Sequence, residues 1–178
     1  MAARSLGFDA VGVLLAVRTN TGYTVSSPMT DAFAVLDDAD VRGESTFTLD
    51  AEHATVAFGS HDDPPGDPAA VDATPEEATR VLGTPYLLAQ FEVVVREALR
   101  GYLPEGTGVV DRGASVSHLA PVAVGRNVDV SATLVGVDRP DLSFACRAER
   151  DDGASVATGD LTLRVVDRDQ FRDSVADR

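Results

Sequence analysis

One long amphipathic helix followed by four strand-like runs is the feature that most restricts the fold of this chain. Pro85 after Thr84 predicts a helix start, with the threonine as N-cap and the proline at the first helical position. One face of this helix carries Leu88, Phe91, Val95, Leu99 and Tyr102. Alternating apolar runs follow at 109–119, 127–138, 142–150 and 155–166. This order predicts an α+β domain with an antiparallel sheet.

Shorter elements are expected before the long helix. Residues 45–49 and 54–58 alternate in polarity and predict two strands. The proline-rich stretch 60–72 predicts a loop or the base of a lid. Thr74, followed by Pro75 and two glutamates, predicts a brief helix that ends near Gly83.

The N-terminal residues differ from the rest in charge. Residues 1–28 carry a net charge of +1 and residues 29–178 a net charge of −15, which sum to the total of −14. Met29 is the only methionine after Met1. We therefore expect the native start at Met29, which leaves 1–28 as a doubtful extension and 29–178 as the domain. The mass of the natively expressed protein tests this expectation.

The composition excludes several classes of protein. The chain has 178 residues and is 44% hydrophobic, which is enough for one domain with a sizeable core. It contains no run of roughly 20 apolar residues for a membrane helix, and residues 10–17 make a poor signal peptide. We therefore expect a cytoplasmic protein that does not engage a membrane. The lone Cys146 excludes an intrachain disulfide, and its alternation with apolar neighbours predicts an inert core thiol.

The charge is strongly acidic and dispersed. Acidic residues number 29 against 15 basic ones, and every basic residue is an arginine. Scattered aspartates are typical of a protein adapted to a high-salt cytoplasm, and a net charge of −14 argues against nucleic-acid binding. An anionic ligand would also be repelled at low salt. At molar salt the Debye length is about 3 Å, so that local arginines decide the binding of anions.

Glu92 is the most informative polar residue, because it projects onto the border of the apolar face, about 40° from Leu88. An ionised carboxylate there is costly unless it has partners, which makes it a candidate catalytic group. The alternative is an ordinary helix-edge glutamate paired with Arg96, four residues later.

Thr84, Glu92 eight residues later and His118 in the motif H-L-A-P-x3-G form a set with a recognisable spacing. The set, together with that motif and residues 142–144, resembles the fluoroacetyl-CoA thioesterase family, whose members are hot-dog-fold acyl-CoA thioesterases. The resemblance runs from roughly Thr46 to Phe171. It implies a single hot-dog domain, in which an antiparallel sheet wraps around one long central helix.

The resemblance assigns catalytic roles to these three residues. Glu92 is expected to act as nucleophile or as general base toward the thioester, and the sequence leaves both roles open. His118, in a strand whose face it shares with Ala114 and Val116, is expected to stabilise developing charge or to move a proton. Thr84 is expected to orient the carbonyl at the helix start, although capping alone also explains a threonine before proline.

Substrate-binding residues are predicted less directly. Phe58 and Tyr86 are candidates for contacts with the acyl chain. Arg126 is a candidate for the phosphates of coenzyme A, with Arg112 and Arg168 as weaker ones. Asp111 occupies a position where the family commonly has a glycine close to the substrate. Leu161 and Leu163 replace a family histidine and arginine. These departures predict that fluoroacetyl specificity is not shared.

Hydrolysis of a small acyl-CoA thioester is thus the expected function, with coenzyme A only as part of the substrate and no bound cofactor. The alternatives are a non-catalytic acyl-CoA-binding hot-dog protein and a hot-dog enoyl-CoA hydratase, although the latter more often uses an Asp/His pair. No metal is expected, because His53, His61, Asp62 and Asp63 fit no standard ligand spacing. A homodimer or larger assembly is expected, since hot-dog sites usually form between subunits.

Overall fold

The computed structural model describes residues 28–62 and 64–176, with side chains from Phe33 onward. Most of the predicted extension 1–28 lies outside the described residues, so that the start at Met29 stays a prediction. The elements, in chain order, are α1 (Pro28–Asp38), β1 (Arg42–Thr48), β2 (Ala54–Ala57), β3 (His61–Asp62), β4 (Pro65–Gly66), a 3-10 turn η1 (Pro75–Glu77), β5 (Thr79–Leu82), α2 (Thr84–Ala98), β6 (Thr107–His118), β7 (Asn127–Asp138), β8 (Asp141–Arg150), β9 (Ser155–Asp167) and α3 (Arg168–Ala176).

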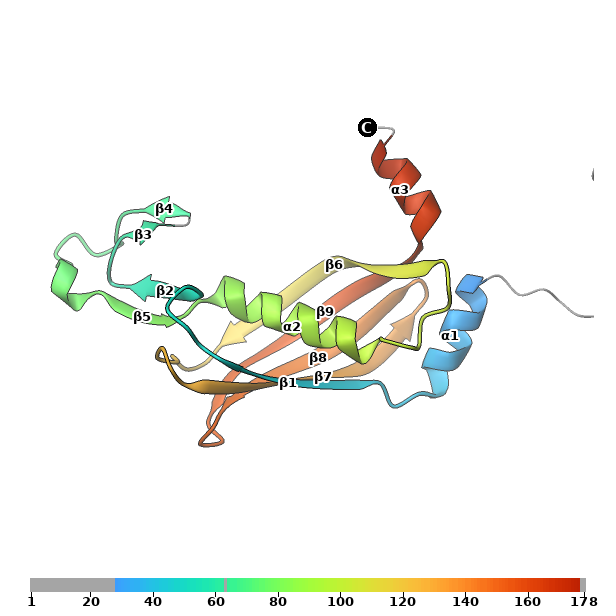
Figure 1. Cartoon of the computed structure of the whole chain (residues 1–178), viewed down its shortest axis with the longest axis horizontal. Coiled ribbons are helices and arrows are strands. Elements are labelled where there is room, and N and C mark those ends of the chain that lie inside the picture. The colour runs from blue at the N-terminus through green and yellow to red at the C-terminus, as the bar shows by residue number, and fades with distance from the viewer. Residues whose placement is uncertain (1–27, 63, 177–178) are drawn as a thin grey trace, which may run out of the picture.

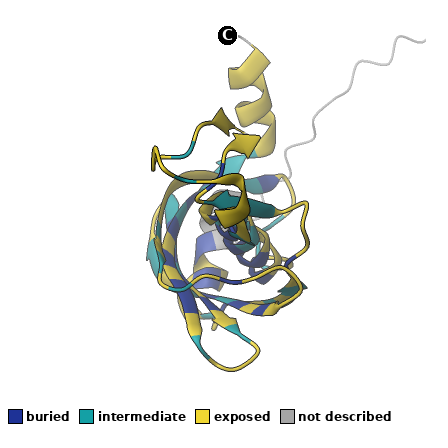
Figure 2. Cartoon of the chain, turned by 90° about the vertical axis from the view of Figure 1, so that its left-hand side faces the viewer, coloured by how far each residue is buried: buried dark blue, intermediate teal, exposed yellow. Residues whose placement is uncertain are grey.

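Five strands form the main sheet, in the order β1-β7-β8-β9-β6, and every neighbouring pair is antiparallel. α2 lies across one face of this sheet, and the strands curve around it (Figures 1 and 2). β1 and β6 are the two edges. The predicted α+β architecture with a sheet wrapped around one helix is therefore confirmed.

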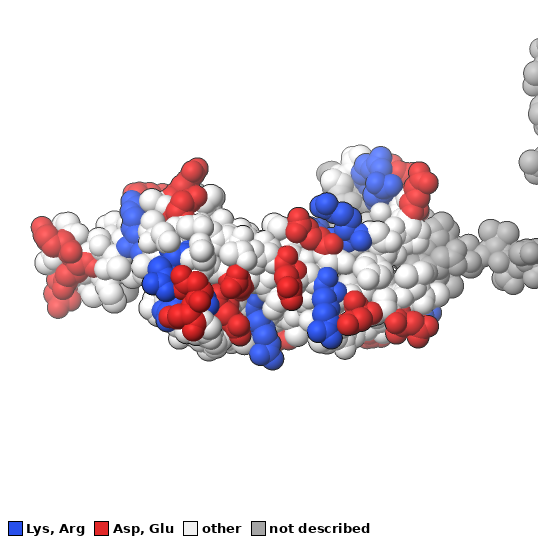
Figure 3. All heavy atoms as spheres, turned by 60° about the horizontal axis from the view of Figure 1, so that its bottom comes forward, with Lys and Arg blue, Asp and Glu red and all other residues white. Residues whose placement is uncertain are grey.

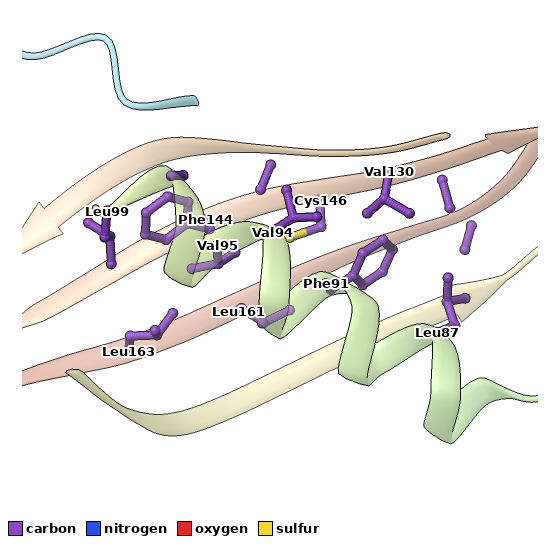
Figure 4. Packing of buried hydrophobic residues seen from close by; sticks show 14 of the residues in the cluster. Leu87, Phe91, Val94, Val95, Leu99, Val130, Phe144, Cys146, Leu161 and Leu163 are labelled. Carbon is purple, nitrogen blue, oxygen red and sulfur yellow. The ribbon is translucent and has the colours of Figure 1, made fainter. Parts of the chain in front are cut away.

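The core fills the space between α2 and the sheet (Figure 4). Leu87, Phe91, Val94 and Val95 of α2 are completely buried there. Leu88 and Tyr102, predicted on the apolar face, are only partly buried and pack at its margin. α2 ends at Ala98, with Leu99 as its C-cap, so that Tyr102 of the predicted apolar face lies beyond the helix.

Cys146 of β8 lies in this core with 2% of its surface exposed. Burial raises the pKa of its thiol to about 12, so that it stays protonated at neutral pH. The prediction of an inert core thiol is confirmed.

Two glycines allow α2 to lie close to the sheet. A Cβ atom on Gly159 of β9 would come 2.8 Å from the backbone oxygen of Ser115 and 2.9 Å from the ring of Phe91. A Cβ atom on Gly43 of β1 would come 2.6 Å from the backbone oxygen of Val94. Real Cβ contacts are not this short, so any side chain at either position would push the helix or a strand away.

Residues 54–82 form a separate part of the molecule, which we call the lid (Figure 1). β2 pairs with β5, and β3 pairs with β4, apart from the main sheet. The prediction of a helix from Thr74 to near Gly83 is wrong, because only the 3-10 turn η1 forms there and β5 follows it. The predicted start signal is real, since the Glu77 carboxylate accepts a hydrogen bond from the backbone of Thr74 at 2.8 Å. β-branched residues then favour strand pairing in residues 79–82.

Two further helices were not predicted. α1 covers one end of the sheet and buries Phe33 and Leu36. α3 projects from the end of β9 and has no buried residue (Figure 1). Within the described residues, no helix is long and apolar enough to cross a membrane.

Candidate active site

The start of α2 brings the first two candidate residues together. Gly83, with extended backbone angles (φ −84°, ψ 145°), is the N-cap, and Thr84 is the first helical residue. The prediction of Thr84 as N-cap is therefore wrong by one position. The reason is local: glycine also serves as an N-cap, and the proline is tolerated anywhere in the first turn, where its missing N–H has no intrahelical acceptor. The hydroxyl of Thr84 is thus free for another partner.

That partner is His118, at the end of β6. Thr84 Oγ1 and His118 Nδ1 lie 3.2 Å apart, and the tautomer of the ring decides which atom donates. The other ring nitrogen, Nε2, is buried and has no hydrogen-bond partner among the described residues. A buried polar atom without a partner is unusual in proteins and is often found at functional sites. Thr84 therefore orients the histidine ring, and the buried Nε2 is left without a partner.

Glu92 lies further along α2, on the same side as Thr84. Helical geometry places it about 12 Å along the axis from Thr84 and about 80° around it. Its side chain is half-buried, and no hydrogen bond or ion pair involving it is found within residues 33–62 and 64–176. The structure thus brings Thr84 and His118 together and leaves Glu92 as a separate carboxylate two turns away.

Arg96 does not form the ion pair with Glu92 that the alternative interpretation required. Its guanidinium instead binds the carboxylate of Asp111 on β6, and it donates to the backbone oxygen of Val109 at 3.5 Å. Thr84, Glu92 and Arg96 therefore follow one ridge of α2, which contacts β6 at both ends. We call this contact the α2–β6 interface.

A second group of side chains lies on the opposite side of the first turn of α2. The ring of Tyr86 stacks on that of His53 at 4.3 Å and meets Phe47 edge-on at 5.5 Å. Asp50 accepts hydrogen bonds from the backbone N–H of His53 at 2.9 Å and from its Nδ1 at 2.8 Å. The backbone bond, and then the ring of His53, lower the pKa of Asp50. Desolvation and the charge of Asp50 raise the pKa of Tyr86.

This group borders a pocket of about 270 Å³ between the lid and α2. The residues around it are Glu52, His53, Ala54, Thr55, Val56, His61, Asp62, Arg80, Gly83, Pro85 and Tyr86. The Nδ1 atom of His61 lies 3.2 Å from the hydroxyl oxygen of Thr55, and among the described residues His61 makes no hydrogen bond with His53. The described residues contain no cluster of three or more metal-ligating side chains, and Asp63 lies outside them.

The remaining predicted binding residues are dispersed. Phe58 lies in the lid, 67% exposed, with a positive φ of 65° that is rare for a bulky residue. It borders a hollow of about 410 Å³ made by lid residues. Arg126 follows the turn at Gly125 and forms an ion pair of 2.5 Å with Asp151. Tyr86 alone lies beside the first turn of α2.

The sequence did not predict that Arg96 binds Asp111, nor the β-bulge that lies beside this contact. In the pairing of β6 with β9, Asp111 is opposite Leu163 and Gly113 is opposite Thr162, so that Arg112 is an extra residue. A glycine inside a strand pattern is the sequence signal for such a bulge, and Gly113 supplied it.

A family model described as "FlK: Fluoroacetyl-CoA-specific thioesterase" matches residues 67–169. A comparison with curated proteins found no match. Similar solved structures include a hypothetical protein of Thermus thermophilus described as a thioesterase superfamily member, at 16% identity and a TM-score of 0.63 over 77% of this chain and 89% of that one. A hot-dog-like protein from Thermanaerovibrio acidaminovorans has 20% identity and a TM-score of 0.62, over 79% and 92% of the two chains.

The fluoroacetyl-CoA thioesterase FlK itself has 21% identity to this chain and a TM-score of 0.61, over 79% of this chain and 96% of that one. At this level of identity the structural likeness establishes the fold, and the family model, which covers more than half of the chain, establishes the relationship. The chain has the hot-dog fold and belongs to the fluoroacetyl-CoA-specific thioesterase family.

Proposed function

We propose that this protein hydrolyses a small acyl-CoA thioester at Thr84, Glu92 and His118. The observation that carries the proposal is the hydrogen bond between Thr84 and His118 at the start of α2, which leaves His118 Nε2 buried and without a partner among the described residues. Membership of a thioesterase family supports the reaction class.

The chemistry follows from the positions of these groups. The first N–H groups of α2 and the Thr84 hydroxyl polarise the thioester carbonyl, as donors at a helix start do for developing negative charge. As a base, Glu92 takes a proton from water while the water oxygen attacks the carbonyl carbon, and the C–S bond then breaks. As a nucleophile, Glu92 attacks the carbon itself, the thiolate of coenzyme A leaves, and water hydrolyses the resulting anhydride.

His118 supplies a proton in either route. Its Nε2, when protonated, donates to the developing oxyanion or to the leaving sulfur. No metal or bound cofactor takes part in this scheme. Coenzyme A is held as part of the substrate, and we assign Arg126, at the end of the turn that follows His118, to its phosphates.

The substrate is proposed only as a class. One structure of FlK, that of a point mutant, is described as a complex with fluoroacetate and CoA. We carry over the CoA thioester and not the fluoroacetyl group, because Asp111, Leu161 and Leu163 depart from the family pattern at positions that lie together. Asp111 pairs with Leu163, and Leu161 is opposite Ala114, on the same two strands. Tyr86 and Phe58 remain proposed contacts of the acyl group.

We also propose that the protein forms a homodimer and works in a high-salt cytoplasm. β6 is a twelve-residue edge strand, and within the described chain it pairs only with β9. An unpaired strand edge invites a second copy to continue the sheet, beside the α2–β6 interface. Light scattering at molar KCl tests this, and a monomer would contradict it.

Release of thiol from a panel of acyl-CoAs at molar KCl tests the function. The buried Cys146 keeps the background of a thiol reagent low. Glu92→Gln removes the base or nucleophile and is expected to lower kcat/KM by about 10²–10⁴-fold. The matched control is Glu97→Gln, five residues further along α2, which removes an exposed carboxylate near Arg100 and should keep full activity.

Each outcome of this test is decisive. Retained activity in Glu92→Gln would remove Glu92 from the mechanism. Binding of acyl-CoAs in calorimetry without turnover of any thioester would instead favour the non-catalytic binding protein. Hydration of an enoyl-CoA without thiol release would favour the hydratase.

A further inference from the structure

We infer that Asp111 is a positioning residue that holds Arg96 away from Glu92 and so keeps this carboxylate free for chemistry. The inference rests on the proposed function, because it assigns a purpose to the unpaired state of Glu92. The observation behind it is that Arg96, four residues after Glu92 on α2, forms its ion pair with Asp111 of β6 instead.

Local geometry alone favours the other choice. Arg96 follows Glu92 by four residues, which places their Cβ atoms about 5–6 Å apart on the helix surface. The order, with the acidic residue on the N-terminal side, is the favourable one for such a pair. A guanidinium in that position would occupy the carboxylate oxygens with hydrogen bonds and neutralise their charge. Glu92 would then be a poorer base and a poorer nucleophile.

The competing carboxylate comes from β6, and the bulge at Arg112 determines which way it points. Val109 and Val116 both pack against the core, although a separation of seven residues would put them on opposite faces of a regular strand. The extra residue Arg112 accounts for this, so that Val109 and Asp111 before the bulge share the inner face with Ala114 and Val116 after it. There Asp111 receives the guanidinium of Arg96, whose second contact is the backbone oxygen of Val109.

The other charged groups nearby have partners elsewhere. Arg112 turns to the outer face of the sheet, where its Nε atom lies 3.5 Å from a carboxylate oxygen of Asp141. Glu97, next to Arg96 on α2, lies 3.9 Å from Arg100. Opposite Asp111 on β9 is Leu163, which is fully buried and offers no charge. Among the described residues, Asp111 is therefore the group that competes with Glu92 for Arg96.

The test is a set of four proteins: wild type, Asp111→Asn, Arg96→Gln and the double variant. Asp111→Asn releases Arg96 to Glu92 and is expected to lower kcat by about tenfold to a hundredfold. Arg96→Gln has no cation to release and is expected to stay within threefold of wild type. The double variant is expected to recover to within threefold as well, because Glu92 is free again.

Rival roles give other patterns. If the ion pair only held α2 against β6, all three variants would lose activity and melting temperature alike. If Asp111 contacted the substrate, Asp111→Asn would raise KM and Arg96→Gln would not rescue it. Either pattern would overturn the inference.

A crystal structure of Asp111→Asn supplies a readout that does not depend on activity. Arg96 is expected within 4 Å of a Glu92 carboxylate oxygen, and an arginine that points into solvent would overturn the inference. If the wild type hydrolysed no thioester, the proposed function would fail, while the position of Arg96 in this crystal would still decide whether Asp111 holds it away.

Discussion

Thr84 occupies the first turn of α2 without capping it, and this changes what a substitution there should do. Its hydroxyl contacts His118 and makes no cap hydrogen bond. Two roles that coincide in many threonines are therefore separated in this one, because the stability of the helix and the orientation of the histidine depend on different groups. A single substitution can remove one without the other.

Thr84→Ala is expected to lower kcat/KM by about tenfold to a hundredfold, because His118 loses the hydroxyl that orients its ring. The melting temperature is expected to stay the same, since alanine is a good helix former and Gly83 remains the N-cap. Steady-state kinetics and a thermal melt measure both quantities. Loss of a true N-cap would cost about 1 kcal/mol, or roughly 2–4 °C in a domain of this size. A drop of that size with unchanged kinetics would contradict the assignment.

At the level of elements, the position of α2 depends on close contact with two strands. Gly159 on β9 faces Phe91, and Gly43 on β1 faces the backbone at Val94. These contacts fix how deeply the helix sits on the sheet. They therefore also fix the height of Glu92 and Thr84 relative to β6.

Gly159→Ala is expected to destabilise the fold by about 1–3 kcal/mol, because the added Cβ would overlap with the ring of Phe91 and the backbone of Ser115. Chemical denaturation measures the change. The control is Gly136→Ala on β7, where a Cβ would meet only Ser143 at an ordinary 3.7 Å. Equal effects of the two substitutions would show that the close contact is not what matters.

The start of β8 ties three strands together through charge. Asp141 accepts hydrogen bonds from Arg164 of β9 at 2.7 and 3.0 Å, and Arg112 of β6 lies 3.5 Å away. The hydrogen bonds from Arg164 lower the pKa of Asp141 most, and the charges of both arginines add to this. A lowered carboxyl pKa stabilises the fold fully above the unfolded pKa of about 3.9 and loses this effect as the pH falls through the folded value.

Asp141→Asn is therefore expected to lower the melting temperature at pH 7. The difference from wild type should persist down to about pH 5 and shrink below about pH 4, as the native aspartate becomes protonated. Thermal melts between pH 2 and 7 measure it. Asp138→Asn, at the other end of the same turn, serves as the control, since it has no ion pair among the described residues. A difference that is still full at pH 2 would contradict this account.

The long elements could be predicted because their patterns agree with the packing that they finally adopt. β7 occupies the predicted residues 127–138, and β8 and β9 differ from prediction by one residue at one end. β5 could not be predicted, because its strand state depends on pairing with β2 and the local proline signal favours a helix. α1 begins at Pro28, after Ser27, so the same kind of start signal was present and was overlooked; its Phe33 and Leu36 cover the end of the sheet.

The candidate site was predictable only in part. The family resemblance grouped Thr84 with His118, and the structure places their side chains 3.2 Å apart, although no hydrogen bond between them was predicted. The partner of Arg96 was not predictable from α2, because it comes from β6 through a bulge that changes which residues face inward. The neighbours of Glu92 thus depend on tertiary pairing, which spacing along one helix does not encode.

At the scale of the whole molecule, acidic and basic side chains of the described residues lie close together. Figure 3 shows acidic and basic side chains interspersed over one face, and most arginines of the described chain lie beside an aspartate or glutamate. Each exposed ion pair of this kind contributes little to the free energy of unfolding. The net charge of −14 remains, and it opposes the compact state through self-repulsion.

Raising KCl from about 0.1 to 2 M is therefore expected to raise the melting temperature, because screening weakens this repulsion more than it weakens the few exposed pairs. Each gain of 1 kcal/mol in the free energy of unfolding corresponds to a rise of roughly 2–4 °C in the melting temperature. Thermal melts across the salt series measure the effect, and sucrose at matched osmolality serves as the control for excluded cosolute. A melting temperature that falls with KCl would contradict the high-salt adaptation.

The two glycine contacts beneath α2 also limit how this protein can adapt to different ligands. Moving α2 away from the sheet to make room for a larger acyl group would open the close contacts of Phe91 with Gly159 and of Val94 with Gly43, and so would leave gaps in the core. The lid, by contrast, joins the body through few contacts, such as the bridge between Val81 and Ala123 and the hydrogen bond from Leu82 to Val122. Changes in the size of the accepted ligand are thus expected to arise from sequence change in residues 54–82, while the helix that carries the reacting groups keeps its place.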